Sequence, residues 1–218
     1  MTQPHATPDD RRRLPSVDSV VDAVAPYVTD LSLMSPRETP EWLQQLAVPD
    51  GWQVVHLDMG SVQPTRTVVA GARDDGGWDG CETISVYRFT GSPPCRVVVE
   101  QNDCTLRGFG GESLTTRPLT APAWQKACAV RSSGYFTAAG RRMWAQYSTY
   151  VFDGDTPGRS WLTLHGLFTS ADARARLRDD VGALSDAVHD AFLTAVATVN
   201  AEAPTIPIPV TEARPHGS

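Results

Sequence analysis

Two patterns that follow one another in the second half of the chain restrict its fold more than any other feature. Three β-rich segments, 127–137, 141–152 and 159–169, are joined by short links that carry Gly or Pro. They predict a meander of three antiparallel strands. An apolar stripe at three- and four-residue steps comes next, formed by Leu177, Val181, Leu184, Val188, Phe192 and Val196. This stripe predicts an amphipathic helix, capped by Thr169 or Ser170, that reaches about residue 199.

The first half of the chain predicts the rest of the same sheet. Strands are expected at 52–59, 65–72, 82–91 and 95–101, with a turn at 73–80 and a loop at 108–124. Ser16 is expected to cap a short helix whose face carries Val17, Val20, Val21 and Val24. We therefore predict an α+β fold, in which an antiparallel sheet of about six or seven strands is packed by terminal helices.

The organisation predicted from these elements is one domain with two tails. Residues 1–15 are polar, charged and Pro-bearing, and predict a disordered tail. Residues 16–203 form the α+β domain, and residues 204–218 a Pro-rich, extended tail that lies against it.

Charge and hydropathy exclude some function classes and suggest a compartment. The net charge of −6 argues against binding to nucleic acid. No apolar run approaches the ~20 residues of a membrane span. The start of the chain has no apolar segment of the kind found in signal peptides, so we expect a cytoplasmic location. Lys126 is the one lysine beside eighteen arginines, a bias typical of GC-rich genomes such as those of actinobacteria.

The four cysteines are Cys81, Cys95, Cys104 and Cys128, and none of them forms a C-x-x-C pair. No histidine stands at metal-ligand spacing from them, so we predict no metal site. In a reducing compartment they are expected to be free thiols, with a Cys95–Cys104 disulfide as the alternative.

Catalytic signatures are absent from the sequence, and we predict neither catalytic residues nor a cofactor. There is no G-x-x-x-x-G-K-[ST], G-x-S-x-G or H-E-x-x-H motif. His56 and Asp58 share one strand face and are the best acid–base pair that the sequence offers. His165 lies mid-strand beside leucines and is expected to be a core or interface histidine.

The strand at 141–152 supplies the predicted binding residues. Trp144, Tyr150 and Phe152 share one of its faces, while Met143, Tyr147 and Val151 share the other. Because both faces are apolar, both are expected to be covered, either by the terminal helices or in part by a ligand or partner. The predicted ligand- or partner-binding residues are Arg141, Trp144, Tyr150 and His165.

Residues 130–192, with VRSSGYFTAAGRRMWAQYSTYVF followed by WLTLHGLFTSADARARL, resemble the C-terminal half of the actinobacterial LpqN-like lipoprotein family. The PDGW at 49–52 is similar to that family's entry into its first strand. The resemblance implies a PsbP-like sandwich of sheet and helices, contact with proteins or lipids, and no catalytic residues. The family's secreted members carry a signal peptide and a lipobox cysteine. Neither occurs in this sequence, so we expect a cytoplasmic relative.

These observations favour a non-enzymatic binding or accessory protein that contacts a protein partner or an apolar small molecule through its sheet. Two alternatives stay open at this point. The first is an enzyme whose active site has no recognisable sequence motif and uses His56 with Asp58, or His165, in a pocket of the sheet. The second is a secretion- or phage-linked interaction protein whose Pro-rich tails bind a partner.

Overall fold

The computed structural model describes residues 19–56, 63–74, 76–122, 126–154 and 160–201. One eight-stranded antiparallel sheet forms the centre of the fold, in the order β2-β3-β4-β8-β7-β6-β5, with β1 also paired to β4. The strands are β1 (Val28–Leu33), β2 (Trp52–Val54), β3 (Arg66–Ala72), β4 (Trp78–Gly91), β5 (Glu112–Pro118), β6 (Ala127–Ala138), β7 (Arg141–Phe152) and β8 (Ser160–Ser170). The helices are α1 (Val20–Val24), α2 (Glu41–Gln44), α3 (Cys95–Gln101), α4 (Cys104–Gly108) and α5 (Arg178–Ala201), with 3₁₀ turns at Ala25–Tyr27 and Pro36–Glu38.

The four longest strands of the sheet are β4, β6, β7 and β8. The link between β6 and β7 is two residues long, Ala139 and Gly140, and both have positive φ (48° and 75°). This is the backbone geometry of a two-residue hairpin that follows the strand twist. The predicted meander is therefore confirmed. The sheet also extends beyond it, because β4 pairs with β8 on one edge and with both β1 and β3 on the other.

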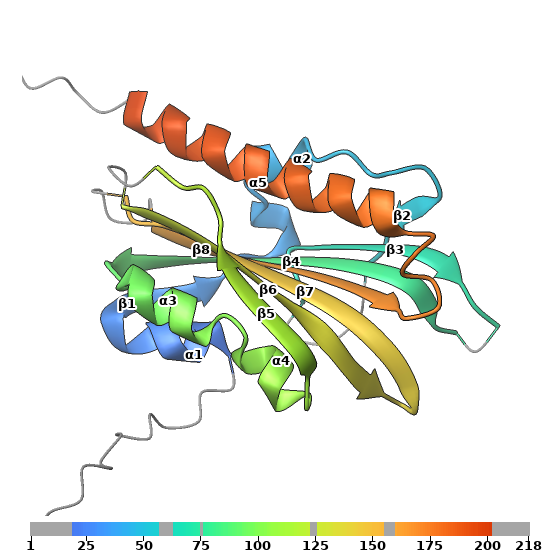
Figure 1. The fold of residues 1–218 in the computed structure, drawn as a ribbon. Helices are drawn as coiled ribbons and strands as arrows, with labels where there is room; N and C mark the ends of the chain where they lie inside the picture. The colour runs from blue at the N-terminus through green and yellow to red at the C-terminus, as the bar shows by residue number, and fades with distance from the viewer. Residues whose placement is uncertain (1–18, 57–62, 75, 123–125, 155–159, 202–218) are drawn as a thin grey trace, which may run out of the picture.

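Helices cover the two faces of the sheet unequally (Figure 1). Helix α5 runs along one face, where its apolar stripe packs on residues of β4, β7 and β8 such as Val86, Tyr150 and Leu167. The indole Nε1 of Trp52 donates to Asp180 Oδ2 at 3.0 Å and so ties β2 to the start of α5. Helices α1, α3 and α4 lie on the other face. There Val24, Val98 and Cys104 pack against Val130, Val151 and Leu162.

The structure corrects several predicted elements. Residues 95–101 form helix α3 and not a strand, and residues 112–118 of the predicted loop form strand β5. Strand β1 was not predicted. The strand expected at 52–59 stops at Val54 in the described part, and β4 begins at Trp78, inside the predicted turn.

Both terminal helices begin later than predicted. Helix α1 is capped by Ser19, whose Oγ accepts from the Asp22 amide, while the predicted cap Ser16 lies outside the described residues. Residues 171–177 form turns, and α5 begins at Arg178. The Ser170 Oγ accepts from the Ala173 amide at 3.3 Å, so Ser170 caps this turn and not the long helix itself.

The expectation of four free thiols is wrong, and so is the alternative pairing. Cys95 at the start of α3 forms a disulfide with Cys128 of β6. Cys81 and Cys104 are free. Partial burial next to Glu82 raises the pKa of Cys81 to about 11, which makes this thiol a poor nucleophile.

Candidate ligand-binding groove

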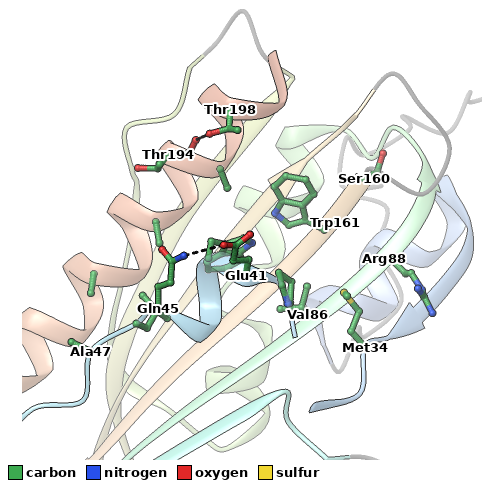
Figure 2. A pocket seen from close by; sticks show the side chains of 16 residues that line it. Met34, Glu41, Gln45, Ala47, Val86, Arg88, Ser160, Trp161, Thr194 and Thr198 are labelled. Atoms are coloured by element: carbon green, nitrogen blue, oxygen red, sulfur yellow. Dashed lines mark hydrogen bonds between the residues drawn. The ribbon is translucent and has the colours of Figure 1, made fainter. Parts of the chain in front are cut away.

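A groove of about 810 Å³ opens between α2 and the C-terminal half of α5, above β4 and β8 (Figure 2). We call it the α2–α5 groove. Sixteen residues line it: Met34, Pro40, Glu41, Trp42, Gln45, Leu46, Ala47, Val86, Arg88, Ser160, Trp161, Ala187, Ala191, Thr194, Ala195 and Thr198. A volume of this size is in the usual range for a small-molecule site in a protein.

The groove exists because α5 carries two different stripes. Its large apolar residues, including Val188, Phe192 and Val196, are fully buried on the sheet. The neighbouring stripe lines the groove and holds only small side chains: Ala187, Ala191, Thr194, Ala195 and Thr198. Small side chains leave the space between α5 and α2 open, and that space becomes the groove.

Most of the groove wall is apolar, and its polar groups are largely satisfied by the protein itself. The hydroxyls of Thr194 and Thr198 donate to carbonyls of their own helix, at 2.9 and 3.0 Å. Arg88 pairs with Glu38 at 3.0 Å. The pKa of Glu38 is lowered, chiefly by its hydrogen bonds from Ser35 and then by Arg88. Gln45 donates to Glu41 at 3.4 Å on the exposed side of α2.

One donor in the groove has no hydrogen-bond acceptor among the residues that the structure describes. The Nε1 of Trp161 is buried, and none of the described residues accepts a hydrogen bond from it. Figure 2 shows its indole between Thr198 of α5 and Ser160 of β8, above Glu41 of α2. The ring packs on Phe152, with centroids 4.5 Å apart. A buried N–H without a partner costs roughly 1–3 kcal/mol, so an oxygen acceptor brought by a ligand would be favoured here.

A buried ionic group lies on the same sheet face, toward the other end of α2. Glu82 is fully buried, and its two carboxylate oxygens lie 3.2 Å from Arg66 Nε and 3.1 Å from His165 Nε2. Arg66 also donates to the backbone carbonyls of Leu46 and Ala47, which follow α2. This group fixes the chain after α2 to the sheet, and so sets one wall of the groove.

The predicted binding residues occupy four separate environments, and none of them lines the groove. Arg141 is exposed at the start of β7, and Trp144 is buried under the guanidinium of Arg174, 4.0 Å from the ring centroid. Tyr150 is buried against Phe192. His165 lies in the core, as expected for a core histidine, and bonds Glu82. Their role in binding stays a prediction.

The predicted acid–base pair is not brought together in the described structure. His56 is exposed and lines a smaller hollow of about 230 Å³ on the far side of α2, and Asp58 lies outside the described residues. Among the described residues, no group of three or more His, Cys, Asp and Glu is placed to hold a metal ion. No helix in this part of the chain has the length and apolar character to cross a membrane.

The groove residues themselves were missed, although α5 carried a signal for them. The recurrence of small residues at positions 187, 191, 195 and 198, beside the large stripe, marks a helix face that leaves room for something else. Trp42 and Trp161 belong to elements 119 positions apart in the sequence, and nothing local shows that they meet in one groove.

Fold and groove together define an α+β sandwich, in which one antiparallel sheet lies between a long C-terminal helix and a group of short helices, with an apolar groove beside the long helix. The same fold occurs in the crystal structure of LpqN, a protein involved in cell envelope biogenesis of Mycobacterium tuberculosis, with a TM-score of 0.57 and 15% sequence identity. The similarity covers 79% of this chain and 96% of the LpqN chain. No family model matches the sequence, and no curated protein matches it.

This comparison confirms the predicted resemblance at the level of the fold, and it extends well beyond the C-terminal half. It also contradicts the expected cytoplasmic location, because the structural neighbour is a protein involved in cell envelope biogenesis. The Cys95–Cys128 disulfide agrees with this correction, since disulfides persist mainly in oxidising compartments.

Proposed function

We propose that this chain is a non-enzymatic binding protein of the cell envelope that holds an elongated apolar ligand in the α2–α5 groove. The observation that carries the proposal is the groove itself, with a volume of about 810 Å³, a mostly apolar lining and one buried donor that has no acceptor among the described residues. Ligand sites commonly combine a large apolar surface with a few polar groups that fix orientation.

An accessory role agrees with the other observations. The sequence carries no catalytic signature, and one solved structure with this fold is that of LpqN, a protein involved in cell envelope biogenesis. The disulfide supports an oxidising location. We infer a ligand with one long apolar part and an oxygen acceptor, which would reach Trp161 Nε1.

Titration with the neutral dye N-phenyl-1-naphthylamine tests the proposal, because its fluorescence rises when it leaves water. We expect saturable binding to the full chain. Ala191→Trp fills the groove and is expected to weaken binding by tenfold or more, about 1.4 kcal/mol. Ala197→Trp is the matched control, since Ala197 is an exposed residue of the same helix that does not line the groove.

Two outcomes would contradict the proposal. The absence of saturable binding to the wild-type chain would show that the groove takes no neutral apolar molecule. Equal loss of affinity in both variants would show that the dye binds elsewhere, or that a tryptophan anywhere on α5 disturbs the fold.

A further inference from the structure

Two tryptophans give the α2–α5 groove a more specific chemistry than an apolar wall alone. Trp42 comes from α2 and Trp161 from β8, and both pack against the same core cluster. The Trp161 N–H is buried and has no acceptor among the described residues. A groove that combines aromatic rings with a free indole donor suits an extended, Pro-rich segment in the polyproline II conformation. Proline rings pack on aromatic surfaces, and the unpaired backbone carbonyls of such a segment accept hydrogen bonds.

The chain carries such a segment directly after α5. Residues 204–210 read PTIPIPV, and α5 ends at Ala201, three residues before them. In polyproline II, residues three apart share an edge. In that conformation Pro204, Pro207 and Val210 would share one apolar edge, and Ile206 and Pro209 would share the next. The third edge would hold Thr205, Ile208 and Thr211.

The groove-lining part of α5 and residues 204–210 have similar lengths. The groove-lining residues of α5 run from Ala187 to Thr198 and span about 17 Å at the helical rise. Residues 204–210 span about 19 Å at the polyproline II rise. Two residues, Glu202 and Ala203, separate the end of α5 at Ala201 from Pro204. Two linking residues are the central part of a β-turn, which reverses the direction of the chain and would let residues 204–210 run back along α5.

We infer that residues 204–210 bind the α2–α5 groove of their own chain in the polyproline II conformation and compete there with the apolar ligand. The competition rests on the proposed function, whereas the contact between segment and groove does not. The segment covers apolar groove surface and brings backbone carbonyls to Trp161 Nε1 when no ligand is present. A ligand has to displace it.

Photo-cross-linking tests the contact without any ligand. The full chain carries p-benzoylphenylalanine in place of Ile206, is irradiated at low concentration, and is digested for mass spectrometry. We expect cross-links, within a species of monomer mass, to peptides that contain Trp42, Trp161 or residues 187–198. Cross-links to other surfaces, no cross-links, or a product of dimer mass would overturn the inference.

Binding of N-phenyl-1-naphthylamine to full-length variants tests the competition. Pro207→Glu with Val210→Glu places two charges on the apolar edge, and is expected to raise dye affinity about tenfold if the segment occupies the groove nine-tenths of the time. Thr205→Glu with Thr211→Glu adds the same charge on the third edge and is expected to leave affinity unchanged. Equal affinity in both variants and the wild type would overturn the competition, whereas no dye binding in any chain would overturn only the proposed function.

Discussion

The Cys95–Cys128 disulfide gives the sharpest test of where this protein folds. It joins the start of α3 to β6 across a sequence separation of 33 residues. Loop-closure entropy for a separation of 33 residues corresponds to about 3.7 kcal/mol at 25 °C. Since domains are commonly stable by only about 5–15 kcal/mol, loss of this link would remove a large share of the free energy of unfolding.

Guanidinium chloride unfolding, with and without a reductant, measures this contribution. We expect the wild-type chain to lose about 3–4 kcal/mol of unfolding free energy on reduction. Cys95→Ala with Cys128→Ala should show a similar loss and no further response to reductant. Cys104→Ala is the matched control, because Cys104 is a buried free thiol of the same core cluster, so this variant should keep its response to reductant.

Thiol titration under denaturing conditions is independent of stability. Without reductant, two thiols per chain should react, those of Cys81 and Cys104. Two results together would refute both the disulfide and its support for an envelope location. They are four reactive thiols in protein taken from an oxidising compartment, and an unfolding free energy that is the same with and without reductant.

Two further predictions concern ionisable side chains, the buried Arg66–Glu82 pair near α2 and His189 on α5. Arg66→Met leaves the fully buried Glu82 with His165 as its one remaining ionic partner among the described residues. The free energy of unfolding, measured with a chemical denaturant, should fall by about 3–5 kcal/mol. Adding Glu82→Gln should recover part of this loss, and no recovery would mean that Arg66 acts through packing alone. Burial, and then the charge of Arg131, lower the pKa of His189, so the unfolded chain binds a proton more readily than the folded one. Unfolding free energy should therefore decline as the pH falls below about 6.5. His189→Gln should flatten this decline relative to the wild type, and an unchanged pH profile would count against the assignment.

The parts of the fold that local pattern determines were predictable. Strands β6, β7 and β8 alternate or run β-branched between short turns, and α5 repeats at helical spacing. Helix α3 was mistaken for a strand because its three consecutive valines favour extended backbone. Burial of Val98 and Asn102 decides in favour of the helix, and Cys95, Val98 and Asn102 do stand at helical spacing.

Other elements depend on contacts that the sequence does not display. Strand β5 is almost wholly exposed at the sheet edge, so it carries no alternation of buried and exposed residues. The Cys95–Cys128 pairing follows from α3 lying on β6, which the strand prediction excluded. The groove depends on how far α2 stands from α5, a distance set by Arg66 and the carbonyls after α2.

The small side chains of α5 that line the groove are expected to make the protein less stable than larger apolar side chains would, and this difference can be measured. Residues that line the groove are not needed to hold α5 on the sheet, because Val188, Phe192 and Val196 do that. Ala187→Leu with Ala195→Leu should therefore extend apolar contact toward α2 and raise the free energy of unfolding. At about 0.8 kcal/mol per buried methylene, the gain is about 1–3 kcal/mol when the added groups are partly buried.

The same double variant should lose N-phenyl-1-naphthylamine binding, so stability and binding would change in opposite directions, as expected where a site is kept open at the expense of packing. Ala183→Leu with Ala197→Leu, at exposed positions of the same helix, is the control for helix propensity. A double groove variant that is less stable than this control would show that the space is too narrow for larger side chains. The stripe would then be small in order to bring α2 and α5 together, and the argument for a ligand site would fail.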